Sequence, residues 1–313
     1  MNKLIGFFFI VNSAALWANN KQEIQTLVDH KKSKEEVVEN PTLKTLSGSL
    51  NKWSLYSTFS YRGGSLENPT SAERPNIKQE EATPNLTDMS GVMGLKYRLS
   101  KNDNLSFQIG LYSTTPFHSS LKTNNKKNQR DFEENHQQIN SDDPVLSYFR
   151  TYYIGELQNI SFFKYQYVTR ESYRDYGGRG IFSFSHAAAY RLNNAVYIAG
   201  SFSYENYSYD KDTVDYFGTD ISIRNQQPEH KYRGNLSLEM YVRKNISFRF
   251  ISDLFSYTKM RDAENSLWDG RQQTIALSYF FNRDISVSPN IRFIAEDLRT
   301  ERSNIGLTLN VNI

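Results

Sequence analysis

The chain has 313 residues, a formal net charge of +3 and no cysteine, so a disulfide framework and a thiolate metal site are excluded. The small charge and the lack of a compact basic motif argue against a nucleic-acid partner. Mean hydropathy is −0.65, yet the chain contains 21 Tyr and 20 Phe, whereas disordered chains are poor in aromatic residues. After residue 20 no apolar run approaches the roughly 20 residues that a membrane-spanning helix needs.

The first twenty residues, MNKLIGFFFIVNSAALWANN, have the pattern of a secretory signal peptide. Lys3 supplies the positive start, residues 4–11 the short apolar stretch, and Ala14, Ala15 and Ala18 the small residues for cleavage. We predict a signal peptide at 1–18, with cleavage after Ala15 as the alternative. The mature chain is therefore expected to be exported.

Residues 19–51 are charged, with Ile24, Leu27 and Val28 at helical spacing. This pattern predicts an extension before the first strand, either a short helix or a solvated tail. A third interpretation, that the segment folds back into the body of the protein as a plug, stays open.

From residue 53 onward, apolar and polar residues alternate with a period of two, which is typical of strands with one wet face. Most of these segments are longer than the roughly 5–6 residues of an ordinary strand, and as long as the roughly 9–11 residues of a tilted membrane-crossing one. About twelve strands are expected, at approximately 52–62, 88–99, 105–112, 145–156, 160–170, 180–192, 195–207, 231–243, 246–257, 272–282, 285–296 and 304–313.

The connections between these strands alternate strictly between tight and long. Tight turns are expected at 100–103, 157–159, 193–194, 244–245 and 282–284, and long polar loops at 63–87, 118–143, 171–179, 208–230, 258–271 and 297–303. All tight turns then lie at one end of the strands, as in transmembrane β-barrels. A soluble β-sandwich does not sort its loops in this way. We therefore predict an all-β fold, a transmembrane up-and-down antiparallel barrel over residues 52–313.

The last ten residues, NIGLTLNVNI, alternate to the end of the chain. Unpaired backbone groups are costly in hydrocarbon, so the last strand is expected to pair with the first and leave no edge. The stripe expected to face lipid consists of Ile305, Leu307, Leu309, Val311 and Ile313.

The signal peptide, the long strands and the terminal stripe together resemble a bacterial outer-membrane β-barrel protein of the porin-like kind. The resemblance implies the outer membrane of a Gram-negative bacterium, with outer-membrane lipids and the assembly machinery as partners. In that class the machinery reads the last strand, which usually ends in Phe; this chain has Ile313 instead. The resemblance also implies a channel for passive diffusion of small polar solutes.

If the apolar stripes face lipid, the opposite stripes line the lumen and are mildly basic. A ring of Arg or Lys favours anions, so a mild anion preference is one hypothesis. The alternative is a non-conducting structural or interaction barrel, whose charges pair across the lumen and which acts through its loops or extension. The expected basic residues are Lys96, Arg98, Arg150, Lys164, Arg191, Arg233, Arg243, Arg249 and Arg292; the acidic ones are Glu156, Glu205, Glu239, Asp253 and Glu296.

No catalytic, cofactor or metal site is predicted. Asp210, Asp212 and Asp215 lack the later bidentate Glu of a calcium loop. The outer-membrane phospholipase is also a twelve-stranded barrel, with a catalytic Ser two residues after a His. Here Ala188 follows His186 at that spacing, and the outward positions of the next strand, 196–202, carry no hydroxyl, so a nucleophile is missing. An omptin-like protease motif is absent too.

His186 itself is expected to face lipid, where a polar side chain is costly unless it is paired or covered. One hypothesis is a homo-oligomer contact at this strand and the next, with Ala188 and Gly200 allowing close approach. A local bulge or the opposite facing is the alternative.

Overall fold

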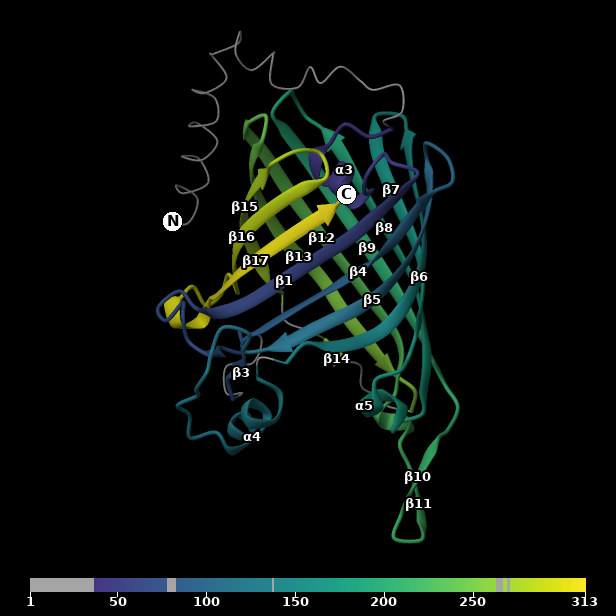
Figure 1. Ribbon diagram of the computed structural model, residues 1–313, viewed down its shortest axis with the longest axis vertical. Coiled ribbons are helices and arrows are strands. Elements are labelled where there is room, and N and C mark those ends of the chain that lie inside the picture. The colour runs from purple at the N-terminus through teal and green to yellow at the C-terminus, as the bar shows by residue number, and fades with distance from the viewer. Residues whose placement is uncertain (1–36, 78–82, 137, 263–266, 269–270) are drawn as a thin grey trace.

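A computed structural model describes residues 37–77, 83–136, 138–262, 267–268 and 271–313. The predicted signal peptide at 1–18 and most of the predicted extension, including Ile24, Leu27 and Val28, lie outside these residues. Within them, twelve long strands form one closed antiparallel barrel (Figure 1). They are β1 (Trp53–Ser65), β4 (Asp88–Arg98), β5 (Asp103–Thr114), β6 (Asn140–Ile154), β7 (Leu157–Tyr167), β8 (Gly178–Arg191), β9 (Val196–Tyr209), β12 (Pro228–Arg243), β13 (Ile246–Met260), β15 (Gln273–Phe280), β16 (Ile285–Phe293) and β17 (Asn304–Asn312).

Each long strand pairs with the next one along the chain, and β17 pairs with β1 to close the ring. In this closing ladder Phe59 lies opposite Leu309 and Thr58 lies opposite Asn310. The Leu55 N–H donates to the Ile313 carbonyl, so the ladder extends to the last residue of the chain. The predicted up-and-down barrel is therefore confirmed.

The two ends of the barrel differ as the loop pattern predicts. The tight-turn end holds the short helix α3 (Pro41–Leu46) and the C-terminus, and the long-loop end holds all the other small elements (Figure 1). These are β2 (Glu73–Arg74), β3 (Asn85–Leu86), α4 (Lys126–Asn135), α5 (Glu171–Arg174), β10 (Thr213–Tyr216), β11 (Thr219–Ser222), η1 (Arg224–Gln226), β14 (Leu267–Trp268) and η2 (Thr300–Arg302).

Two expected connections differ from the structure. The tight turn expected at 157–159 lies at 155–156, because residues 157–159 already pair with β6. The loop expected at 118–143 is shorter. β6 begins at Asn140 rather than 145, because residues 140 and 141 still pair with β5 across a register shift. The loop also contains α4, which begins where the Asn125 side chain accepts hydrogen bonds from the Lys127 and Asn128 N–H groups at 3.0 and 3.3 Å.

Ion pairs brace two of the long connections. Asp212 contacts Arg224 at 2.9 Å and Arg261 at 2.6 Å, which ties the base of the β10–β11 hairpin to the end of β13. Hydrogen bonding to Arg299 lowers the pKa of Asp297 to about 2. Because the folded-state pKa is depressed, this pairing stabilises the β16–β17 loop at neutral pH and is lost only as the pH falls through about 2.

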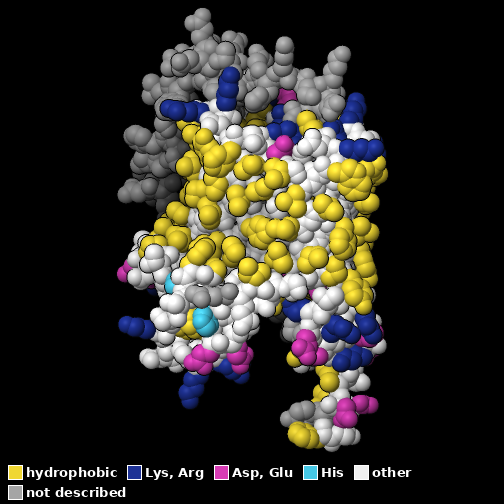
Figure 2. Space-filling model, viewed as in Figure 1, with side chains coloured by type: hydrophobic (Ala, Val, Ile, Leu, Met, Phe, Trp, Pro, Cys, Tyr) yellow, Lys and Arg dark blue, Asp and Glu magenta, His cyan; other side chains and the backbone are white. Residues whose placement is uncertain are grey.

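The barrel wall has an apolar outer face and a polar inner face. Figure 2 shows hydrophobic side chains in a band across the visible face of the wall, with charged groups gathered towards the two ends. On the inner face small polar groups bond across strands, as between Ser106 and Ser147 at 2.6 Å and between Ser288 and Ser278 at 2.8 Å. No helix among the described residues is long and apolar enough to cross a membrane.

The terminal stripe lies on the outer face. Leu307, Leu309 and Ile313 are exposed, while Asn304 and Asn312 of the same strand are buried on the inner side. This placement agrees with the expected facing of the stripe Ile305, Leu307, Leu309, Val311 and Ile313. That the assembly machinery reads this strand stays a prediction.

Closure at β17 is expected to be essential for folding. Leu309 has strand neighbours on both sides, Phe59 and Val287, and Leu309→Pro removes a backbone donor from a central strand. We expect Leu309→Pro to yield no folded barrel, measured as loss of the heat-modifiable band in gel electrophoresis. Leu309→Val, which keeps the donor and the apolar face, is the control and should fold. A folded Leu309→Pro barrel would contradict the role of this ladder.

Candidate functional site: the barrel lumen

Residues 37–51 occupy the lumen at the tight-turn end. α3 begins where the Asn40 side chain accepts from the Leu43 N–H at 2.9 Å and Pro41 stands in the first turn, both typical of helix starts. The helix ends at Ser47, and Gly48 then takes a φ of +71°, which lets the chain turn towards β1. Local sequence therefore builds a single helical turn in this position.

An apolar contact attaches this turn to one side of the wall. Val38 and Leu43 pack with Phe149 of β6, Ile160 of β7 and Ala189 of β8, and none of the five is more than 4% exposed. Partly buried residues at the edge of this cluster are Val37, Leu46, Phe162, Ala187 and Ala199. Burial of this surface is favourable because it removes apolar area from the water of the lumen.

Glu239 of β12 holds the other side of the segment. Its carboxylate accepts hydrogen bonds from Asn40 Nδ2 at 3.0 Å, Thr42 Oγ1 at 2.7 Å and Ser247 Oγ at 3.0 Å. Hydrogen bonds to an ionised acceptor are stronger than those between neutral groups. Gln158 of β7 adds a second fixed acceptor, since its Oε1 receives the backbone N–H groups of Glu39 and Asn40 at 2.6 and 2.7 Å.

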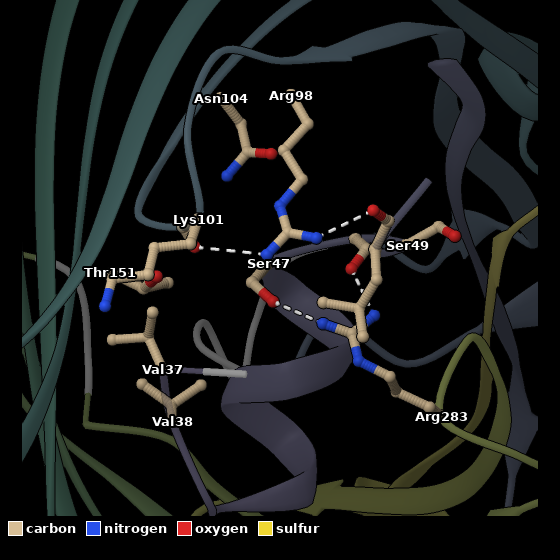
Figure 3. A pocket seen from close by; sticks show the side chains of 11 residues that line it. Val37, Val38, Ser47, Ser49, Arg98, Lys101, Asn104, Thr151 and Arg283 are labelled. Atoms are coloured by element: carbon tan, nitrogen blue, oxygen red, sulfur yellow. Dashed lines mark hydrogen bonds between the residues drawn. The ribbon is translucent and has the colours of Figure 1, made fainter. Parts of the chain in front are cut away.

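Three cations of the wall donate to the carbonyl oxygens that follow α3. Lys96 donates to Ser49, Arg98 to Leu50 at 2.7 Å, and Arg283 to Gly48, with Arg283 also 3.3 Å from Ser47 Oγ. Figure 3 shows Arg98 and Arg283 approaching the Ser47–Ser49 stretch from opposite sides. The predicted lumen residues Lys96 and Arg98 are thus bound to the segment.

A second charged cluster lies in the long-loop half of the lumen. Arg62 of β1 contacts Asp88 of β4 at 2.6 Å, and Arg74, from the loop that joins these strands, contacts the same carboxylate at 3.4 Å. Arg292 of β16 interacts electrostatically with Arg62, Asp88 and Asp253. We call these five residues the arginine cluster. Its three guanidinium groups exceed its two carboxylates, so it is locally basic.

The remaining predicted lumen residues lie on other parts of the inner face. Lys164 of β7 places its Nζ 5.2 Å from the centre of the Phe162 ring. Arg249 lies opposite Glu239 in the β12–β13 register. Arg233 has Ser203 and Ser256 as its register neighbours.

The prediction that Arg150 lines the lumen is wrong. Arg150 is half exposed and forms an ion pair with Asp103 at 3.7 Å, while its neighbour Phe149 points inward to the segment. Successive side chains on a strand face opposite sides, so Arg150 faces outward. The prediction assumed that apolar side chains on β6 face lipid; instead Phe149 packs on Val38 and Leu43 inside the barrel.

His186 faces outward, as expected, but the expectation that no hydroxyl lies beside it is wrong. Ser161 of β7 lies opposite His186 in the register, with its Oγ 2.9 Å from His186 Nδ1, and Tyr152 OH lies 3.0 Å from the same Oγ. That expectation rests on the outward positions of the following strand alone. The three groups satisfy one another, which reduces the cost of polar atoms on the outer wall.

Ala188 and Gly200 form a register pair beside this polar chain. A Cβ added at Gly200 would meet only the Asn235 carbonyl oxygen, at 3.7 Å, so the wall is smooth at this point. His186, Ala188 and Gly200 therefore lie together on the outer face of β8 and β9.

Phe149 is expected to contribute strongly to stability because it is 1% exposed and contacts the segment. We expect Phe149→Ala to lower the free energy of unfolding by about 3–5 kcal/mol, the usual range for a buried Phe. Denaturant titration in detergent micelles measures the change. Phe163→Ala, at the adjacent outward position of β7, is the matched control and should cost much less. Equal losses would contradict the inward packing of Phe149.

No family model and no curated protein matches this sequence. The fold is similar to that of an outer membrane channel from Pseudomonas putida F1, with a TM-score of 0.51 and 11% identity over 84% of this chain and 97% of that chain. The NanC porin (TM-score 0.45, 9% identity, 83% and 98% covered) and a KdgM porin in complex with disordered oligogalacturonate (0.39, 6%, 83% and 99%) are further matches. The protein thus has the twelve-stranded barrel fold of an outer-membrane channel.

Proposed function

We propose that this protein is a porin-like channel of the outer membrane of a Gram-negative bacterium, for passive diffusion of small polar solutes. The observation that carries the proposal is the closed barrel with an apolar outer wall and a polar inner wall. A sheet without an edge is what hydrocarbon requires, and a polar inner face suits a hydrated path. The tight-turn end is then periplasmic and the long-loop end external.

The arginine cluster supports a mild preference for anions. Its residues Arg62, Arg74 and Arg292 project from β1, from the loop after it and from β16, so their charges meet on one side of the external half of the lumen. A pore lined by Arg attracts anions electrostatically. Three further basic groups, Lys96, Arg98 and Arg283 at the periplasmic end, are bonded to residues 48–50 and contribute less to solute selection.

The alternative is a non-conducting structural or interaction barrel, and one observation favours it. Residues 37–51 fill the periplasmic mouth and bond to its wall. Single-channel recording in planar bilayers separates the two functions. Stable openings support the channel, and silence from correctly folded protein supports the alternative.

Anion preference is expected to depend on the arginine cluster. A unit charge about 4 Å from an ion contributes about 1 kcal/mol in water. We therefore expect Arg62→Gln and Arg292→Gln each to lower the anion-to-cation permeability ratio roughly fivefold, measured as the reversal potential in a salt gradient. Arg150→Gln removes a cation from the outer wall and should leave the ratio unchanged. An equal shift in Arg150→Gln would contradict the assignment.

We also propose a homo-oligomer that uses the outer wall around His186, Ala188 and Gly200. The smooth Ala188–Gly200 pair permits close approach, and the Tyr152–Ser161–His186 chain offers polar groups at a lipid-free contact. His186→Leu should then lower the oligomeric mass measured by light scattering in mild detergent. Tyr165→Leu, a substitution at an outward position of the neighbouring strand β7, is the control. A monomer in the wild type would exclude the oligomer.

A further inference from the structure

The segment 37–51 contacts almost the whole circumference of the periplasmic mouth. Besides the apolar contact with β6, β7 and β8, it bonds to Glu239 of β12, to Arg283 in the β15–β16 turn and to Lys96 of β4. On the closing side, Asn312 of β17 donates to the Thr45 carbonyl at 2.8 Å. Contacts on every side leave little room for a solute to pass the segment.

One cavity beside the segment is too small for a solute. The cavity seen in Figure 3, between Val38, Ser47 and Leu50 of the segment and Arg98, Asn104 and Arg283 of the barrel, measures about 10 Å³. A water molecule needs roughly 10–15 Å³ of such space. A hydrated solute therefore does not pass at this point while the segment is in place.

The barrel does not need the segment to complete its hydrogen bonds. The segment supplies no strand to the wall, and the ladders β12–β13 and β17–β1 close the ring without it. Its attachments are side chains of the wall, mostly Lys96, Arg98, Arg283 and Glu239, and water can solvate all four when the segment leaves. When the segment leaves the lumen, its hydrogen bonds with the wall are therefore replaced by hydrogen bonds with water, and one small apolar cluster becomes exposed.

We propose that residues 37–51 are a displaceable plug, which closes the channel while it is bound in the periplasmic mouth and opens it by leaving the lumen. This inference rests on the proposed channel function and adds its regulation. The bound plug is one state of an equilibrium, and any change that weakens its contacts shifts the population towards the open channel.

Two variants weaken the plug by independent routes. Val38→Asp places a carboxylate in the apolar cluster without altering the wall, and burial of an unpaired charge there is strongly unfavourable. Glu239→Gln removes the charge of the carboxylate that accepts hydrogen bonds from Asn40 and Thr42. The matched controls are Val38→Ile, which keeps the apolar contact, and Glu205→Gln, which removes a lumen carboxylate that accepts a hydrogen bond from the Tyr207 hydroxyl and not from the segment.

Two measurements follow displacement and conduction separately. Lys44 lies within α3 and is 8% exposed, so trypsin should cleave after it only when the plug has left the lumen. Single-channel recording then gives the open time. We expect Val38→Asp and Glu239→Gln to cleave at Lys44 faster and to stay open about tenfold longer than the wild type, since hydrogen bonds to charged groups contribute in this range. Both controls should behave as the wild type.

Each other outcome has a definite meaning. Cleavage at Lys44 in the wild type as fast as in Val38→Asp overturns the plug, because the segment would not reside in the mouth. Faster cleavage in the variants with unchanged open time also overturns it, because departure would not open the channel. Faster cleavage with no conduction by any folded form instead refutes the proposed channel function.

Discussion

The structure depends on one constraint: every backbone hydrogen bond of the wall must be satisfied within the wall. The β17–β1 ladder meets this condition, since it joins the last strand to the first from Tyr56–Asn312 to Ser65–Asn304. Once the ring is closed, side chains have only two directions, and alternation divides each strand between lipid and lumen. The polar mean hydropathy and the apolar surface are consequences of this division.

Closure also explains why the sequence was sufficient to predict the fold. Strand length, strict alternation and the alternation of tight and long connections are local properties, and each remains visible in a single chain. The expected strands all occur, with differences mainly at the long-loop end, as at β6, where residues 140 and 141 still pair with β5 beyond a register shift. Strand ends on the long-loop side are harder to predict because solvent can satisfy the backbone groups that do not pair.

The lumen was less predictable because its contents come from distant parts of the chain. The partners of residues 39–45 stand at Gln158, Glu239 and Asn312, between 118 and 267 positions away. No local pattern reports such contacts. One local signal was present: Asn40 followed by Pro41 is a helix start, and it marks α3. The helix predicted from the sequence is instead at Ile24, Leu27 and Val28, which lie outside the described residues.

The error at Arg150 has the same origin. Alternation assigns faces correctly only if one knows which face is apolar, and the inner wall carries an apolar patch where Phe149, Ile160 and Ala189 receive the segment. At Ser161 and His186 the outer wall likewise carries polar groups, which bond to each other. The first departure occurs where the wall contacts residues 37–51 rather than lipid or water. The second is compensated by hydrogen bonds within the wall itself.

Contacts with residues 48–50 also limit which basic groups of the lumen can bind a solute. A count of inward charges treats all cations as available to solutes, but Lys96, Arg98 and Arg283 donate to carbonyl oxygens of residues 48–50. A cation that is bonded to a neutral carbonyl keeps its charge yet loses the donors that would bind an anion. If the plug leaves as proposed, these donors become free at the tight-turn end, while the arginine cluster remains at the long-loop end. The open channel would then have cations at both ends, so displacement of the plug would alter selectivity as well as conductance.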